Sequence, residues 1–172
     1  STVGTVTEIH DYFRLLFAHI GKPHCWKCRK LVERQTVQQI VDTILKYKKG
    51  SKIHILAPLV RGRKGEHKSL IDKIRKDGFL RIRIDGEVLS IDQKHKLNKN
   101  KKHTIEVVVD RLILNDKIKD RLTESIELAT KVGSGLVVVN QLPNRERIFS
   151  EKFACPDCEV SIEEIVPRMF SF

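Results

Sequence analysis

The feature that most constrains the fold of this chain is the arrangement of its cysteines in two Cys-x-x-Cys pairs. The first pair is Cys25 and Cys28, and the second is Cys155 and Cys158. A two-residue spacing lets one tight turn present both sulfurs of a pair to the same metal ion, and four thiolates suit tetrahedral zinc. We therefore expect a zinc site made of all four cysteines. The long segment between the pairs must then leave the site and return to it as an insertion.

Disulfide bonds and thiol redox chemistry are the alternatives that the four cysteines leave open. A disulfide framework is typical of small secreted domains, for which four cysteines in 172 residues are sparse. A thioredoxin-type pair is expected at the start of a helix after a strand, whereas loops flank both pairs here. His24 adjoins the first pair, but neighbouring residues seldom share one metal ion, so we do not count it as a ligand.

The positive charge of the chain is concentrated between the two cysteine pairs. The whole chain has 33 basic and 22 acidic side chains. From Lys46 to Lys102 there are 18 basic residues against 6 acidic ones. This excess favours an acidic partner, either a nucleic acid or a protein. No apolar run approaches the length of a membrane span, so no membrane partner is expected.

Two amphipathic helices are predicted before residue 50. A capping box at residues 5–8 precedes a helix that extends to about Ile20, and a second capping box at residues 36–39 begins the other helix. The apolar positions of both helices recur at helical spacing, which predicts that both stripes face a core. These positions are Ile9, Phe13, Leu16, Phe17 and Ile20 in the first helix, and Val37, Ile40, Val41, Ile44 and Leu45 in the second.

From residue 52 onward, one order of strands and helices occurs twice. The first copy is predicted as strand 52–57, helix 66–77 and a hairpin of strands 79–84 and 87–91, turning at Asp85 and Gly86. The second is predicted as strand 104–114, helix 116–132 and strands 135–141 and 146–150. The predicted fold class is therefore α+β. Two βαββ units form a mostly antiparallel sheet, inserted between the two halves of a small helical base that carries the four cysteines.

Two basic stretches, residues 61–68 and 94–103, lie in predicted connections of this domain. Gly62 and Gly65 let the first approach a phosphate, although no segment has the P-loop pattern of nucleotide-binding proteins. The second has five lysines and no aromatic residue for base stacking. A solvated loop and salt-sensitive contact with a DNA backbone both stay open. The candidate phosphate contacts are Arg61, Arg63, Lys64, Lys99, Lys101 and Lys102.

Charged and apolar residues alternate along the strand predicted at 79–84. Arg81 and Arg83 therefore project from the same face of the sheet. An ordinary solvated face with cross-strand ion pairs is one interpretation. A docking surface is the other, because the planar guanidinium group suits the recognition of carboxylates. No activated serine or cysteine and no His-Glu-x-x-His motif is present, so we predict no catalytic residues.

A series of short motifs, one of them Arg81-Ile-Arg-Ile-Asp-Gly-Glu87, runs along nearly the whole chain. The motifs lie at residues 1–12, 14–18, 57–58, 61–66, 81–87, 101–111, 149–150, 152–156, 167–168 and 170–172. In this order they closely resemble the UvrA family, the damage-recognition ATPases of bacterial nucleotide excision repair. The alternative is a self-sufficient zinc protein that binds nucleic acid through residues 46–102.

The resemblance implies a domain organisation and a partner. Residues 1–29 and 150–172 would belong to the zinc-bearing part of the first signature domain, and residues 30–149 would form the inserted domain that binds UvrB. It implies that docking uses charged contacts, with Arg81 and Arg111 as the first candidates, followed by Arg83 and Asp85. It also implies structural zinc and a cytoplasmic bacterial protein. The parent would be a longer homodimer that works on DNA and whose ATP-binding motifs lie outside this chain.

The cysteine turns depart from the family pattern Cys-Pro-x-Cys-Gly. Trp26 stands in place of the proline, and Arg29 and Glu159 stand in place of the two glycines. Glycine readily adopts the positive φ that lets such a turn aim backbone amides at sulfur. We therefore expect these turns to hold a metal ion less tightly than the family pattern does.

Overall fold

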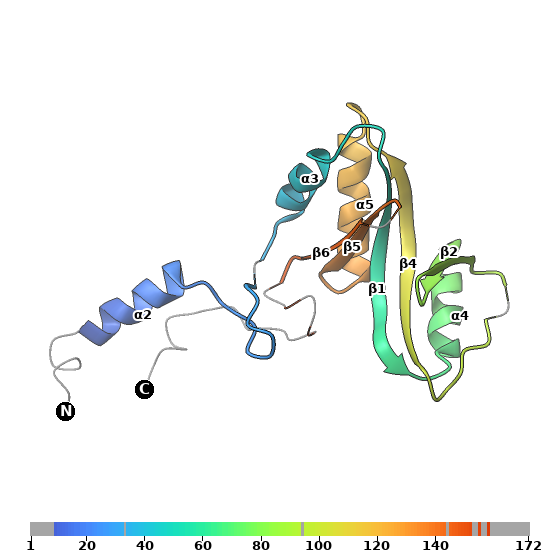
Figure 1. Cartoon of the computed structure of the whole chain (residues 1–172), viewed down its shortest axis with the longest axis horizontal. Coiled ribbons are helices and arrows are strands. Elements are labelled where there is room, and N and C mark those ends of the chain that lie inside the picture. The colour runs from blue at the N-terminus through green and yellow to red at the C-terminus, as the bar shows by residue number, and fades with distance from the viewer. Residues whose placement is uncertain are drawn as a thin grey trace. The chain divides into compact units, whose positions relative to one another are not determined.

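The computed structural model describes residues 9–32, 34–93, 95–143, 145–152, 155 and 158 (Figure 1). The chain divides into two compact units, one drawn from residues 1–34 and 152–172 and the other from residues 35–151. The elements are α2 (Ile9–Ile20), α3 (Val37–Leu45), β1 (Lys52–Lys64), α4 (Lys68–Lys76), β2 (Arg81–Ile84), β3 (Glu87–Ser90), β4 (Lys102–Ile113), α5 (Lys119–Val132), β5 (Leu136–Gln141) and β6 (Arg145–Ser150).

The second unit is built on one antiparallel sheet of six strands, in the order β3-β2-β4-β1-β5-β6. The predicted α+β class with two βαββ units is confirmed. The hairpin of each unit pairs with the long strand of the other unit, because β2 pairs with β4 and β5 pairs with β1. Exchanging β1 with β4, β2 with β5 and β3 with β6 gives the same strand order read from the opposite edge of the sheet. The two units are therefore interlocked about a pseudo-twofold axis between β1 and β4.

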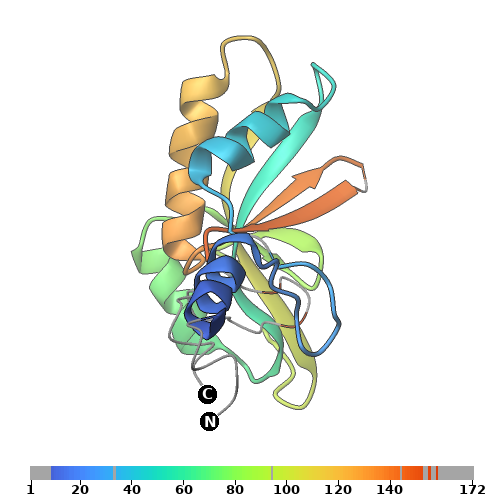
Figure 2. The same ribbon diagram turned by 90° about the vertical axis from the view of Figure 1, so that its left-hand side faces the viewer.

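Helices cover one face of this sheet and form the main core with it. Ile55 and Val107 on the central strands are fully buried, and they belong to the same cluster as Ile44 of α3, Ile71 of α4 and Ile126 of α5. Figure 2 shows α4 and α5 on the same side of the strands. Full burial of one such aliphatic side chain contributes roughly 1.5–3 kcal/mol to folding. The alternating apolar residues of the strands therefore fix which face the helices occupy.

The second predicted capping box is confirmed at the start of α3. The Thr36 hydroxyl accepts a hydrogen bond from the backbone N–H of Gln39 at 3.2 Å, and the Gln39 side chain accepts one from the backbone N–H of Thr36 at 2.9 Å. The helix buries Ile40, Val41 and Ile44, as its apolar stripe predicts.

The face of the sheet opposite the helices has a small core of its own. Leu56, Val108 and Val138 are buried there, from β1, β4 and β5. Across the same face, Arg83 of β2 donates a hydrogen bond to Glu146 of β6 at 2.6 Å, although three strands separate β2 from β6. The sheet must therefore coil strongly enough to bring its two sides together over this face.

Several predicted boundaries differ from the observed ones, and three of these differences have a clear structural cause. β1 continues to Lys64 and makes part of the first basic stretch a strand, since its pairing with β4 continues past several register shifts. α4 begins at Lys68, because His67 has a left-handed backbone (φ 48°). α5 begins at Lys119, because the Asn115 side chain accepts a hydrogen bond from the N–H of Lys117 at 2.9 Å and forms a turn before the helix.

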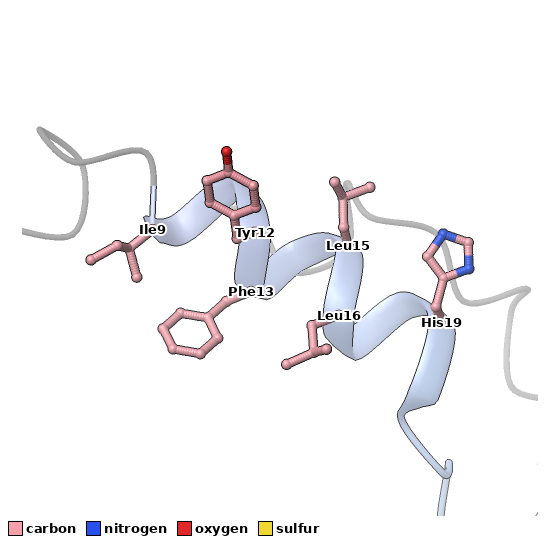
Figure 3. Close-up of a pocket in the computed structure, with 6 residues that line it drawn as sticks. All are labelled: Ile9, Tyr12, Phe13, Leu15, Leu16 and His19. Atoms are coloured by element: carbon pink, nitrogen blue, oxygen red, sulfur yellow. The ribbon is translucent and has the colours of Figure 1, made fainter.

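The prediction that the apolar stripe of α2 faces a core is wrong for this structure. Helix α2 has no buried residue, and Phe13 and Ile20 are 48% and 66% exposed. An open pocket lies on this helix, and Figure 3 shows the side chains that line it: Ile9, Tyr12, Phe13, Leu15, Leu16 and His19. Helical spacing predicted the helix itself, but no described residue packs over its stripe. The capping box predicted at residues 5–8 lies outside the described residues.

Candidate functional site

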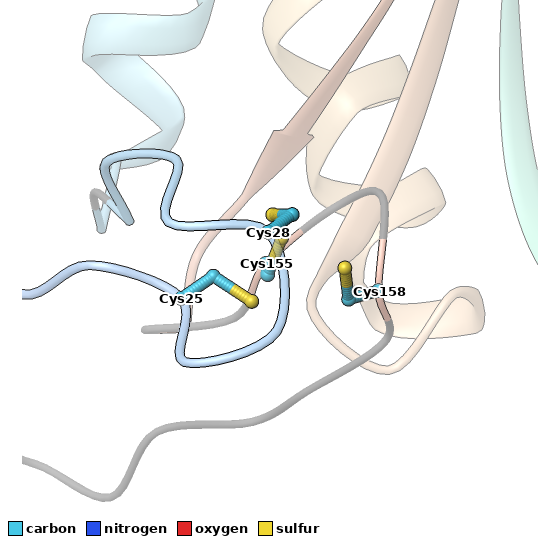
Figure 4. Close-up of side chains that lie close together, drawn as sticks. All are labelled: Cys25, Cys28, Cys155 and Cys158. Atoms are coloured by element: carbon cyan, nitrogen blue, oxygen red, sulfur yellow. Dashed lines mark hydrogen bonds between the residues drawn. The ribbon is translucent and has the colours of Figure 1, made fainter.

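The four cysteines come together, as the insertion hypothesis requires. Their sulfur atoms all lie within 4.8 Å of one another, and those of Cys28 and Cys155 are 3.4 Å apart (Figure 4). Cys25 and Cys155 are buried, Cys28 and Cys158 are partly buried, and all four are free of disulfide bonds. With Zn–S bonds of about 2.3 Å, a regular tetrahedron has edges of about 3.8 Å. The donor set and its spacing can therefore hold one metal ion.

The first cysteine turn forms although its family-pattern glycine is replaced. Arg29 adopts a positive φ of 59°, and its backbone N–H donates to the carbonyl of Cys25 at 2.7 Å. The N–H of Cys25 donates in turn to the carbonyl of Lys30 at 2.8 Å. The arginine thus takes the conformation that glycine adopts more readily, which carries a backbone strain. Glu159, the other departure, lies outside the described residues.

The thiols of this cluster differ strongly in acidity. A hydrogen bond from the backbone of Cys28 is the largest influence on Cys25, and with that from Lys27 it outweighs burial and lowers the pKa of the Cys25 thiol to about 6. The hydrogen bond with Cys28 is the main reason that the pKa of the Cys158 thiol rises to about 12. The cluster thus favours a thiolate at Cys25 and a protonated thiol at Cys158. A cation must displace thiol protons, so its affinity is expected to rise with pH.

The two arginines predicted to lead partner binding lie at one cavity. Arg81 and Arg111 are both exposed, and both line a hollow of about 360 Å³. Arg121, which sequence analysis did not select, lines the same hollow from α5. The structure brings these three side chains together from β2, β4 and α5. Whether they contact a partner stays a prediction.

Arg83 has a different environment from Arg81, although both lie on the same face of β2. It is buried, and its guanidinium group donates hydrogen bonds to Glu106 and Glu146. Burial opposes its charge, but these two carboxylates raise the pKa of Arg83. The side chain therefore links strands of the sheet in this structure, and a role in docking stays a prediction.

Asp85 holds the turn between β2 and β3. Its carboxylate accepts a hydrogen bond from the backbone N–H of Thr104 at 2.8 Å and contacts Nδ1 of His103 at 2.7 Å. Asp85 and Gly86 both have positive φ, as the predicted Asp-Gly turn requires. Asp85 thus fastens the hairpin to the start of β4.

The two basic stretches meet at one end of the sheet. The register of β1 and β4 pairs Arg63 with His103 and Lys64 with Lys102. Lys99 and Lys101, in the loop before β4, are exposed as well. Arg61 is half-buried. Residues from two predicted loops thus form a single basic end of the domain, while Lys94 of the second stretch lies outside the described residues.

Sequence reasoning missed the acidic partners of Arg83 and Arg121. Glu106 and Glu146 hold Arg83, and Asp110 holds Arg121. Glu106 lies on the strand predicted at 104–114, but the sheet order that sets it beside Arg83 is a long-range property. No local pattern in the sequence reports it.

Comparison with known proteins identifies the family. A model of the UvrA interaction domain matches residues 35–143 of the chain. The chain belongs to this family. The resemblance predicted from its motifs is confirmed. The matched residues contain strands β1 to β5 and helices α3, α4 and α5.

Individual relatives are similar to this chain over its whole length. The UvrABC system protein A is 58% identical to it in Clostridium acetobutylicum, 53% in Clostridium tetani and 51% in Methanothermobacter thermautotrophicus. Each alignment covers 100% of this chain but 18% of the relative. The chain therefore corresponds to about a fifth of these proteins. Among the described residues, no helix is long and apolar enough to cross a membrane.

Proposed function

We propose that this chain is the protein-docking module of a UvrA protein and binds UvrB during nucleotide excision repair. Its membership of the UvrA interaction domain family carries the proposal. The placement of Arg81 and Arg111 supports it, because two exposed guanidinium groups at one cavity suit an acidic surface. The resemblance extends the proposal to a cytoplasmic, homodimeric parent whose ATPase motifs lie elsewhere. No P-loop pattern occurs in this chain, so we expect it not to hydrolyse ATP.

Titration of the purified chain with UvrB tests this function. Arg81→Glu and Arg111→Glu should each weaken binding by about 2–4 kcal/mol if they are central contacts, since a reversed charge repels the partner's carboxylate. Lys131→Glu is the matched control, because it makes the same charge change at an exposed position of α5. Folded chain that shows no UvrB binding at moderate salt would exclude the function.

The four cysteines hold a structural zinc ion in this proposal. Cys25, Cys28, Cys155 and Cys158 supply four sulfur ligands, and the ion joins turns that are far apart in the sequence. Elemental analysis should give one zinc per chain, and Cys25→Ser with Cys155→Ser should lower that ratio well below one. A chain that contains no zinc and two disulfide bonds after aerobic purification would reject this assignment.

The basic end of the sheet favours a second function, contact with a DNA backbone. The β1 and β4 register gathers Arg63, Lys64 and Lys102 at one end, with Lys99 and Lys101 beside them. Backbone contacts predict affinity for duplex DNA of any sequence that falls steeply as salt rises. The double variant Lys99→Gln with Lys101→Gln removes two positive charges. The plot of log affinity against log salt concentration should therefore become shallower by a slope of about two. Unchanged affinity in that variant would argue for a solvated loop.

A further inference from the structure

β4 has an irregularity two residues before Arg111. In its pairing with β1, Ile55 is opposite Asp110 but Leu56 is opposite Val108, so Val109 is an additional residue. Such a bulge redirects the side chains that follow it. Asp110 contacts α5 on the helix side, and the alternation of the strand places Arg111 on the other face. The direction of Arg111 therefore depends on how firmly this bulge is held.

Three donors hold the carboxylate of Asp110. Arg121 donates from Nε and Nη2 at 2.9 and 2.8 Å, and the Ser125 hydroxyl donates at 2.9 Å. The backbone N–H of Arg111 itself donates to Asp110 at 2.7 Å. Partial burial opposes ionisation, yet these hydrogen bonds lower the pKa of Asp110. We call Asp110, Arg121 and Ser125 the Asp110 clamp; it ties the bulge of β4 to helix α5.

Two residues of the clamp, Asp110 and Arg121, line the same cavity as the exposed arginines Arg81 and Arg111. Phe79, Leu80 and Val109 give this cavity an apolar wall, and Arg81, Arg111 and Arg121 give it three positive charges against the single carboxylate of Asp110. Arg121 is already paired with Asp110. Among the described residues, no ion pair engages Arg81 or Arg111. Two guanidinium groups are thus available at a partly apolar hollow.

We propose that the Asp110 clamp is a positioning device for docking: it fixes the bulge so that Arg111 and Arg81 receive an acidic side chain of the protein partner in this cavity. The inference rests on the proposed function and deepens it. Arginine gains most from a preorganised geometry, since each flexible side chain that must be ordered on binding lowers affinity. Loss of the clamp should therefore weaken binding without removing a contact with the partner.

A carboxylate of a protein fits this cavity better than a phosphate of DNA. The apolar wall can cover the methylene groups of an aspartate or glutamate, whereas a phosphate backbone offers no apolar part for it. Lysine-rich contact with a polyanion is available instead at residues 61–64 and 99–102. The cavity and the basic end are thus suited to different partners.

The test is a titration of the full chain and its variants with UvrB. Asp110→Asn should weaken binding about two- to tenfold, which corresponds to the ordering of one side chain on binding. Arg121→Gln should weaken it similarly, and Arg121→Lys less. Lys119→Gln, which removes one charge from the same helix outside the clamp, should leave the affinity unchanged. Ser125→Ala is the mildest variant and is informative if another variant unfolds; thermal unfolding of each variant is measured alongside.

Coupling to Arg111 separates positioning from a general structural role. In an Arg111→Ala background, Asp110→Asn should have no further effect on binding, because the side chain that it positions is absent. Additive losses, or Asp110→Asn binding as tightly as the unaltered chain, overturn the inference while the proposed function stands. Weakened binding of a short DNA duplex with unchanged UvrB binding overturns it in favour of a phosphate site. If the unaltered chain does not bind UvrB, the proposed function fails and the inference fails with it.

Discussion

At the scale of residues, Arg81 and Arg83 show what alternation along a strand predicts and what it omits. The period of two placed both side chains on one face of β2, and the structure agrees. Their environments differ because Glu106 of β4 and Glu146 of β6 approach Arg83 and leave Arg81 exposed. Those approaches depend on strand order and on the coiling of the sheet. The sequence could therefore predict a charged face, but not which arginine of it is buried.

Replacing these two arginines should separate stability from docking. Arg83→Met should destabilise the domain by about 3–5 kcal/mol, since it leaves the buried carboxylate of Glu106 without its partner. Arg81→Met should change stability by less than about 0.5 kcal/mol, as is usual for an exposed residue. Urea unfolding followed by far-UV circular dichroism measures both. Equal stability of the two variants would show that the ion pairs of Arg83 contribute nothing net.

The Asp85 and His103 pair should make stability depend on pH. The hydrogen bond with Asp85 is the main reason that the pKa of His103 is raised above 6.5. Desolvation opposes the ionisation of Asp85, but the bonds from His103 and Thr104 lower its pKa below 3.8. The pair's stabilisation is thus fully present between pH 3.8 and 6.5. It is lost as pH rises through the raised pKa of His103, and as pH falls through the lowered pKa of Asp85.

His103→Gln tests this dependence. The variant should be destabilised relative to the unaltered chain at pH 5.5, and the difference should shrink as pH rises through the raised pKa of His103. In an Asp85→Asn background, His103→Gln should lose most of this pH dependence. Comparing variants at each pH cancels the titration of the cysteines, which all of them share. A difference that grows toward pH 9 would assign the opposite sign to the pair.

At the scale of elements, local signals predicted the existence of helices and strands better than their limits. The capping box of α3 and the Asp-Gly turn both act over a few residues, and both are confirmed. The extension of β1 to Lys64 depends on pairing with β4, which is remote in sequence. The exposed stripe of α2 is a further case, because helical spacing predicts an apolar face but not what covers it.

The capping box predicts a measurable contribution to α3. Thr36→Ala removes the acceptor for the N–H of Gln39 and should destabilise the domain by about 1 kcal/mol. Thr36→Ser keeps the hydroxyl and should recover most of that loss. Thermal unfolding of the two variants under the same conditions measures the difference. If Thr36→Ala and Thr36→Ser unfold together, the hydroxyl does not stabilise the helix.

At the scale of the whole molecule, the interlocked sheet explains why the repeat was visible in the sequence but its topology was not. Each βαββ copy supplies its own order of elements, which periodicity reports. The exchange of hairpins between the copies places β2 on β4 and β5 on β1, and no local pattern distinguishes this from two separate sheets. In each copy, the long strand does not pair with the hairpin of the same copy: β1 pairs with β5, and β4 pairs with β2. We therefore infer that the two copies fold as one cooperative unit.

Removal of the metal should act on one unit of the molecule and spare the other. Trp26 is the single tryptophan of the chain, lies between Cys25 and Cys28, and is 71% exposed. Its fluorescence therefore reports on the cysteine turns, whereas far-UV circular dichroism reports mostly on the sheet and helices of residues 35–151. If zinc ties the cysteine turns together, a chelator should change the fluorescence and leave the circular dichroism and its thermal transition nearly unchanged.

A matched variant makes this result specific to the cysteines. Cys28→Ser should reproduce the fluorescence change without a chelator, and added zinc should restore the signal in the chelated chain but much less in the variant. The physical reason is that the main core of the second unit contains no cysteine and its free energy of folding comes from apolar burial against the sheet. Loss of the sheet's circular dichroism together with the fluorescence change would mean instead that the sheet depends on the metal ion for its folding.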